Sequence, residues 1–277
     1  MRLPVLLAVT LTASACAQPS HRTTGAAQAS RVLTDDEWCA DGWQSREYET
    51  ACEVREIVTS ADALDVAATN GSVTVKRWDR SDVLVRARVT ATARQATEAA
   101  RLVDATEVTV RGGVVREETP DTARDRWVAV SYEVFAPGRT DLEATATNGP
   151  VNVHGLDGVV TVLATNGPVQ LTGVSGDVGV WATNGPVGVT LDGRTWRGAG
   201  LDVTATNGPI TVELPRDYSA RLSAETRVGR ISTDGLDLPR RERASYVGDA
   251  LDETLGSGGA PVRLRATNGP VRLKVLD

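Results

Sequence analysis

VTVLATNGPVQL, residues 160–171, is one of six copies of a twelve-residue pattern that decides the fold of this chain. The other copies begin at Leu64, Leu142, Val178, Leu201 and Val262. Every copy keeps Ala-Thr-Asn-Gly, then Pro or Ser, then Val or Ile, and ends on Val or Leu. A pattern that recurs in this way along one chain is typical of repeat proteins, in which each unit packs on its neighbours.

The physical reading of one copy is a strand, a sharp bend and a second, shorter strand. Before the bend, Val160, Val162 and Ala164 are apolar at every second position, which is the periodicity of a strand with one buried face. After the bend, Val169 and Leu171 alternate again. Asn-Gly between the two runs allows a positive φ at little cost, and the following Pro restrains the chain as it leaves the bend.

The spacing of the bends predicts how the copies assemble. Asn148, Asn166, Asn184 and Asn207 lie one unit apart, and a degenerate copy follows with Val228 in the Asn position. Strand-bend-strand units joined by tight returns predict an all-β fold, a single-stranded β-solenoid or β-helix-like stack of short strands. We expect coils of about 18–23 residues that stack about 4.8 Å apart.

Stacking would place the equivalent asparagines of successive coils above one another, where each amide can donate and accept a hydrogen bond. The sequence therefore predicts a structural ladder of Asn70, Asn148, Asn166, Asn184, Asn207 and Asn268. The alternative is that the same row binds a sugar or an ion. The bend needs a turn residue at this position in either case, and this favours the structural ladder.

Two stretches interrupt the repeats. Residues 76–141 contain strand-like runs and one short helix, predicted over residues 93–105. The predicted apolar face of this helix consists of Ala96, Ala99, Ala100 and Val103. We expect the helix to pack over one end of the stack, because an open end exposes unpaired strand edges. Residues 234–259 are polar and end in a Gly-rich run, which predicts a long surface loop and a candidate interaction site.

The N-terminus has the features of an export signal. Arg2 precedes an apolar run, Leu3–Leu11, that is too short to span a bilayer. The small residues before Cys16 make residues 13–16 resemble a bacterial lipobox, which implies lipidation of Cys16 and a membrane anchor on the periplasmic or extracellular side. The alternative is a plain secretory signal. The expected organisation is a lipoprotein-type signal peptide at 1–16, a flexible tether at 17–34, and a β-solenoid domain at 35–277 that divides into an N-terminal part at 35–141 and the repeat stack at 142–277.

Two further cysteines, Cys39 and Cys52, remain after Cys16. An even pair in an exported chain predicts a disulfide. The alternative is two reduced thiols, and the spacing does not fit a redox or metal motif. The formal net charge of −6 lacks the basic footprint of a nucleic-acid-binding protein, so we expect no nucleic-acid partner.

The residues offer little for catalysis. His21 lies in the expected tether and His154 on a return between repeats, and neither has a nucleophile or a metal-ligand pattern around it. We therefore predict no catalytic residue, no metal site and no cofactor. Stacked carboxylates at the returns are an alternative calcium site. These are Asp157, Asp177, Asp192 and Asp234. A carbohydrate-active enzyme is a further alternative, for which the outward candidates are Asp202, Glu213 and Arg265.

The repeats, the cysteine pair leading into Cys52-Glu53-Val54-Arg55-Glu56, and the strand-helix-strand start together resemble the bacterial adhesin-like proteins of the "toastrack" type. The resemblance covers residues 35–277. It implies an extracytoplasmic β-solenoid with a role in surface attachment or in envelope-stress systems. We therefore expect a non-enzymatic envelope lipoprotein that is an adhesin or surface-binding module for an envelope polysaccharide or host matrix, with the membrane as a partner through its lipid anchor. The alternative is a scaffold or envelope-stress component that contacts another membrane protein.

Overall fold

The computed structural model describes most of the chain beyond its N-terminal segment. The described residues are 29–34, 36–40, 47–122, 124–236, 238 and 248–276. The expected signal peptide, Cys16 and residues 17–28 of the expected tether lie outside this set, as do residues 239–247 of the expected loop. The predictions for these segments stay predictions.

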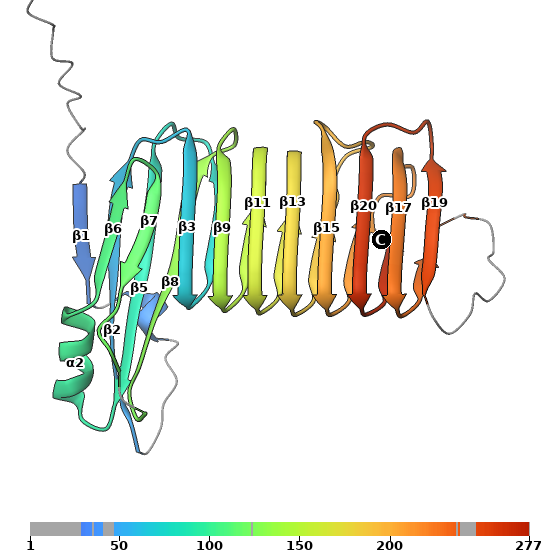
Figure 1. Cartoon of the computed structure of the whole chain (residues 1–277). Coiled ribbons are helices and arrows are strands. Elements are labelled where there is room, and N and C mark those ends of the chain that lie inside the picture. Colours follow the sequence, from blue (N-terminus) through green and yellow to red (C-terminus); the bar gives the residue numbers. More distant parts are fainter. Residues whose placement is uncertain are drawn as a thin grey trace, which may run out of the picture.

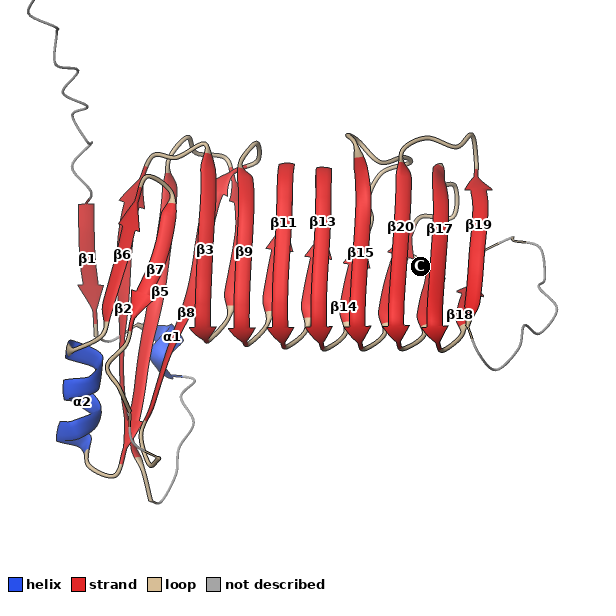
Figure 2. Cartoon of the chain, in the orientation of Figure 1, coloured by secondary structure: helices blue, strands red, loops and turns tan. Residues whose placement is uncertain are grey.

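Two long sheets of mostly parallel strands lie face to face and form a stack (Figure 1). Across the described residues, sheet A contains, in spatial order, β1 (Ala29–Leu33), β2 (Glu49–Thr59), β5 (Val83–Ala93), β8 (Trp127–Pro137), β4 (Val73–Trp78), β10 (Val151–His154), β12 (Val169–Thr172), β14 (Val187–Thr190), β16 (Ile210–Leu214), β21 (Val271–Val275) and β18 (Ile231–Asp234). Sheet B contains β19 (Asp249–Leu255), β17 (Ala220–Val228), β20 (Pro261–Asn268), β15 (Gly200–Asn207), β13 (Ser175–Asn184), β11 (Asp157–Asn166), β9 (Asp141–Asn148), β3 (Ala63–Asn70), β7 (Val114–Glu118) and β6 (Glu107–Arg111). Strands dominate the structure (Figure 2), and the predicted all-β stack is confirmed.

One coil passes through both sheets. β11 runs through sheet B to Asn166, the chain bends sharply, and β12 continues in sheet A. β11 pairs in parallel with β9 and β13, in a register that sets Asn166 beside Asn148 and Asn184. β12 pairs in the same way with β10 and β14. Neighbouring coils therefore repeat one another residue by residue.

The core lies between the two sheets and consists of the alternating apolar positions. Val160 and Val162 of sheet B and Val169 and Leu171 of sheet A are almost completely buried. Ala164 is the inward residue next to the bend, where the chain passes from sheet B to sheet A. All six copies have a buried Ala at this position, two residues before Asn, and a larger side chain would have to find space in a densely packed interior.

The coils do not stack in chain order. The last coil of the chain, β20 and β21, lies between the coil of β15 and β16 and the coil of β17 and β18. The degenerate copy with Val228 is thus the terminal coil of the stack, although another copy follows it in the sequence. This order keeps the six asparagines contiguous, because a coil without Asn inside the stack would divide the row.

The prediction of a loop at 234–259 is wrong for eight of its residues, since Asp234 ends β18 and seven further residues form a strand. Asp249–Leu255 form β19, which pairs antiparallel with β17 and covers the C-terminal edge of sheet B. Leu251 and Leu255 are the only buried residues of this strand, and its other residues are acidic, small or polar. An edge strand with so few inward apolar side chains gives a weak signal in the sequence.

The predicted helix is present as α2 (Ala96–Asp104), which packs against β2 and β5 at the N-terminal end of the stack (Figure 1). Its buried face differs from the prediction, because Ala96 and Ala100 are exposed while Leu102 is buried with Ala99 and Val103. The three buried residues follow the i, i+3, i+4 spacing, and the larger Leu102 turns the apolar stripe toward the sheet.

Two further N-terminal elements differ from expectation. A single-turn helix, α1 (Glu37–Ala40), precedes β2. β1 occupies residues 29–33 of the expected tether and pairs antiparallel with β2, with Val32 opposite Arg55. The tether prediction is therefore wrong for these residues. The side chains of Ser30, Arg31 and Val32 are exposed, so the strand is held by backbone hydrogen bonds and shows no apolar alternation.

Candidate functional site

Five hydrogen bonds join the asparagines at the bends into one row. Asn148 Nδ2 donates to Asn70 Oδ1 at 2.9 Å, and the same bond repeats at 2.9–3.0 Å from each later coil to the one before it. The members of the row, in spatial order, are Asn70, Asn148, Asn166, Asn184, Asn207 and Asn268. Each internal amide donates on one side and accepts on the other, which is the arrangement that the structural ladder requires.

The glycine after each Asn allows the coils to approach one another. Gly167 has a φ of +150°, a conformation that side chains other than glycine rarely adopt. A Cβ on Gly167 would lie 2.2 Å from the carbonyl oxygen of Gly149. The backbone N–H of Gly167 donates to the carbonyl oxygen of Asn184, in the next coil, at 2.9 Å. Glycine at the bend is therefore a requirement of the coil spacing.

The cysteine pair forms the disulfide that the sequence predicts. Cys39 in α1 is bonded to Cys52 in β2. Beside it, the ring of Trp38 packs against the guanidinium groups of Arg86 and Arg88. The disulfide and these contacts together hold α1 on the outer face of sheet A.

A charge network lies in a hollow of about 430 Å³ beside Trp38. Arg86 contacts Asp36 at 2.6 Å, Glu56 at 3.0 Å and Glu133 at 2.8 Å. Burial alone would raise the pKa of Glu133, but the hydrogen bonds from Lys76 and Arg86 lower it. The charges are satisfied by one another, so the network is suited to holding α1 in place.

The histidine and the acidic residues of the returns do not assemble into a site. Burial and the charge of Lys76 lower the pKa of His154, which lies on the outer face of sheet A. Asp157 is in register with Ser175, whereas Asp177 is in register with Val159, so the carboxylates do not stack. Within the described part of the chain, no group of three or more His, Cys, Asp or Glu residues could hold a metal ion. No described helix is long and apolar enough to cross a membrane.

The three outward charged residues separate onto opposite sides of the molecule. Asp202 in β15 and Arg265 in β20 lie on the outer face of sheet B, and Arg265 Nη1 contacts the two carboxylate oxygens of Asp202 at 2.8 and 3.0 Å. Glu213 lies on β16, in sheet A. The structure therefore brings Asp202 and Arg265 together and keeps Glu213 away from them, so the convergence that an enzyme site needs is not formed by these residues.

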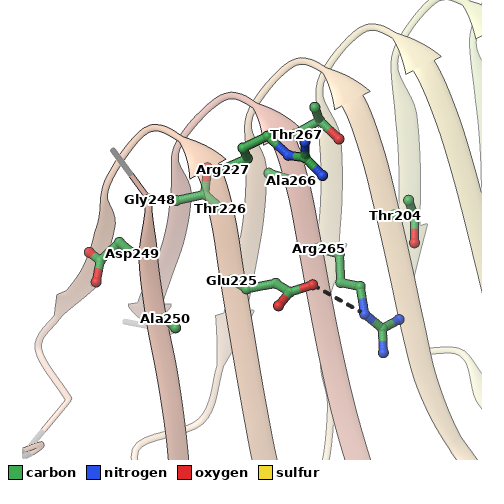
Figure 3. A pocket seen from close by; sticks show the side chains of 10 residues that line it. All are labelled: Thr204, Glu225, Thr226, Arg227, Gly248, Asp249, Ala250, Arg265, Ala266 and Thr267. Atoms are coloured by element: carbon green, nitrogen blue, oxygen red, sulfur yellow. Dashed lines mark ion pairs between the residues drawn. The ribbon is translucent and has the colours of Figure 1, made fainter. Parts of the chain in front are cut away.

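Arg265 also borders an open groove of about 770 Å³ on the outer face of sheet B, near the C-terminal end of the stack. In Figure 3 its side chain extends along the surface between Glu225 and Thr204. Arg265 Nε lies 3.5 Å from Glu225 Oε1, so the guanidinium group is held by Asp202 on one side and Glu225 on the other. About 45% of the Arg265 side chain remains exposed, which leaves it available to a ligand.

Next to this groove, outward hydroxyl groups line the bend side of sheet B. The Thr before each ladder Asn points outward and is exposed or half-buried. These residues are Thr69, Thr147, Thr165, Thr183, Thr206 and Thr267. Arg227 follows Thr267 in the terminal coil, and no ion pair joins it to another described residue. The row therefore ends on an available positive charge inside the groove.

The sequence analysis missed Trp181, which is 47% exposed on the same face. It lies in β13, in register with Leu163 of β11 and Thr204 of β15. The sequence did contain a signal for this residue, because Trp181 is an aromatic residue at an outward strand position in a chain in which only 4% of the residues are aromatic. Tryptophan is enriched at interfaces because its large ring is apolar while its N–H can meet a polar partner.

A half-buried carboxyl group lies near the first bend. Glu117 accepts hydrogen bonds from the Thr69 N–H at 2.7 Å and from the Tyr132 hydroxyl at 2.9 Å. Burial nevertheless raises its pKa above the ordinary value of a glutamate. Its two partners lie in β3 of sheet B and β8 of sheet A, so we assign Glu117 a structural role, in which it links the two sheets in the N-terminal part of the stack.

No family model and no curated protein sequence matches the chain. Solved structures that are similar to it include a candidate cell adhesion protein from Clostridium sporogenes, with 10% identity, a TM-score of 0.43, and coverage of 82% of this chain and 100% of the other. A candidate adhesin from Bacteroides fragilis has 12% identity and a TM-score of 0.26, with coverage of 84% and 98%.

A candidate lipid-binding protein from Parabacteroides distasonis is similar over 82% of this chain and 97% of its own, with 13% identity and a TM-score of 0.27. A candidate adhesin from the same organism covers 81% and 97%, with 8% identity and a TM-score of 0.28. Each of these four structures matches about four-fifths of this chain.

Proposed function

We propose that this chain is a non-enzymatic envelope lipoprotein whose β-stack is a surface-binding, adhesin-like module. The observation that carries the proposal is the outer face of β13, β15, β20 and β17, which we call the binding face. It combines the groove of about 770 Å³ with Arg265, which is held in place by two carboxylates and still exposed. A rigid sheet that holds charged and hydroxyl side chains in a fixed array is suited to recognising an extended polymer.

The N-terminal sequence supports the proposed location. Lipidation at Cys16 would anchor the mature chain outside the cytoplasm, with the segment after it as a short connection to β1. A disulfide between Cys39 and Cys52 supports an oxidising compartment, because such bonds persist in exported proteins. The ligand proposed for the module is an envelope polysaccharide.

The binding face can be tested with the purified full-length protein in detergent micelles. We expect it to co-sediment with isolated envelope polysaccharide, and Arg265→Glu combined with Arg227→Glu to reduce this binding at least about tenfold. Loss of charge-assisted hydrogen bonds to a ligand has effects of this size. Arg272→Glu combined with Lys274→Glu is the matched control, since it also reverses two positive charges but on the outer face of sheet A.

The outcome of this comparison decides the proposal. If the protein binds neither envelope polysaccharide nor host matrix, the surface-binding function is wrong. If the sheet A control weakens binding as much as the double variant does, the binding face is wrongly placed.

A second candidate function is contact with another envelope protein, and the end of sheet A favours it. β18 pairs with β21 and is the last strand of that sheet among the described residues. The Ile231 N–H at this edge donates to Asp249 Oδ2 instead of to a further coil. An exposed strand edge is a common docking site for a partner strand. Crosslinking in cells from position 232 would trap one specific product if this candidate is right, and a random set of products if it is wrong.

A further inference from the structure

The indole ring of Trp181 lies down on the surface of sheet B. A Cβ placed on Gly179, two residues earlier in β13, would be 2.5 and 2.6 Å from two atoms of the six-membered ring. The ring therefore occupies the space that a side chain at position 179 would fill. An exposed fraction of 47% matches a ring with one face against the sheet and the other in solvent.

The neighbours of this ring are polar on two sides. Gly179 is in register with Thr161 of β11 and Asp202 of β15, so these side chains flank the seat of the ring at the strand spacing of about 4.8 Å. The Asp202 carboxylate is oriented by Arg265 at 2.8 Å and keeps further lone pairs free to accept hydrogen bonds. Thr204, in register with Trp181 itself, adds a hydroxyl group toward the groove.

An aromatic face bordered by hydrogen-bonding groups is complementary to a sugar ring. The C–H groups on one face of a pyranose can lie on the electron-rich face of an indole, while its hydroxyl groups reach the carboxylate and hydroxyl groups at the edges. Peptide and lipid partners bury apolar groups more completely. Burial of Trp181 against either would also desolvate the neighbouring Asp202 carboxylate, which is costly.

We propose that Trp181, seated on Gly179, is the stacking platform for a pyranose ring of a polysaccharide. The polysaccharide chain continues across β15 and β20 to the Arg265 groove, so that Asp202 and Arg265 bind its hydroxyl or carboxylate groups. This inference rests on the proposed surface-binding function and names the ligand class and the residues that hold it.

The test is isothermal titration calorimetry of the full-length protein in detergent micelles with chitohexaose, mannohexaose and hexagalacturonic acid. We expect saturable binding of at least one of these, weakened at least about tenfold by Trp181→Ala. Trp127→Ala is the matched control, because Trp127 is 50% exposed but lies on β8 of sheet A. Gly179→Ala should also weaken binding, because its methyl group lifts the ring from the sheet while the fold tolerates it.

The outcomes separate this inference from the function on which it rests. If none of the three hexasaccharides binds, or if Trp127→Ala weakens binding as much as Trp181→Ala, the platform is wrong. Binding to envelope polysaccharide that is unchanged in Trp181→Ala would retain the surface-binding function and overturn only the platform. Hexasaccharide binding without any binding to envelope material would support the platform and overturn the proposed function.

Discussion

Replacing the glycine at a bend tests the account of coil packing, and Gly167→Ala is the variant to begin with. Its φ of +150° is strained for alanine, at a cost of about 1–3 kcal/mol. The new Cβ would lie 2.2 Å from the carbonyl oxygen of Gly149, so the two coils must separate locally. That separation weakens two hydrogen bonds between the coils, Gly149 N–H to Asn166 and Val151 N–H to Pro168, each worth about 0.5–1.5 kcal/mol.

The expected loss of unfolding free energy is about 2–6 kcal/mol, a large part of the stability of an ordinary domain. Two other glycines separate the contributions. Gly193 has a φ of +67°, and a Cβ placed there would have one neighbouring atom, at 4.0 Å. Gly193→Ala should therefore lower the unfolding free energy by about 1–2 kcal/mol through backbone strain alone. Gly179→Ala is not at a positive φ and meets only the movable Trp181 ring, so its effect should be close to zero.

Urea denaturation followed by far-ultraviolet circular dichroism would rank the three variants. The order of destabilisation should be Gly167→Ala, then Gly193→Ala, then Gly179→Ala. If Gly167→Ala lowers the unfolding free energy no more than Gly193→Ala does, the close approach of the coils does not require glycine at the bend, and the reasoning is refuted.

Three further predictions concern the ladder, the half-buried carboxyl group of Glu117 and the disulfide. Asn166→Ala removes two ladder hydrogen bonds and Asn70→Ala removes one. Asn166→Ala should therefore lower the unfolding free energy about twice as much. Equal losses of unfolding free energy in urea denaturation would contradict a continuous ladder. The folded-state pKa of Glu117 is raised above its unfolded value, so the unfolding free energy should fall as pH rises between these two values and stay level above them. Glu117→Gln should remove this slope, and an unchanged slope in stability measured from pH 4 to 8 would show that another group causes it. Cys39→Ser should cost about 3 kcal/mol, because the disulfide closes a short loop, and a melting temperature that does not respond to this change or to reductant would argue against that constraint.

The repeat architecture could be predicted because its signals are local. Alternation around Val160 and Val169 indicates two strands, and Asn-Gly indicates the bend between them. Copies with equal residues at equal positions then predict the register, since any other pairing would bring unlike residues together. The ladder follows from the register, because the asparagines occupy the same position in every coil.

The order of the coils depends on long-range pairing that no single segment encodes. The last coil enters the stack between two earlier coils, a choice made by strand pairing between residues far apart in the sequence. One signal was present, since Val228 in place of Asn marks a coil that needs no further neighbour. The two edge strands β1 and β19 were missed because edge strands bury little and therefore carry weak alternation.

The candidate site was predicted only in part. Asp202 and Arg265 were identified as outward charges, and the register explains why they meet. Glu213 has the same alternation but follows a bend, which transfers it to the other sheet. Trp181 and Gly179 form a platform only because the ring folds back along its own strand, a side-chain conformation that residue periodicity does not encode.

The most direct measurement of the central claim is hydroxyl-radical footprinting of the full-length protein with and without isolated envelope polysaccharide, read by mass spectrometry. Trp181 and Trp127 are exposed to similar extents, 47% and 50%, and lie on different sheets, so each serves as the internal reference for the other. A surface-binding module that uses the outer face of sheet B predicts that the polysaccharide protects Trp181 from oxidation and leaves Trp127 unprotected. Protection of Trp127 alone, or equal oxidation of both with and without the polysaccharide, would contradict it.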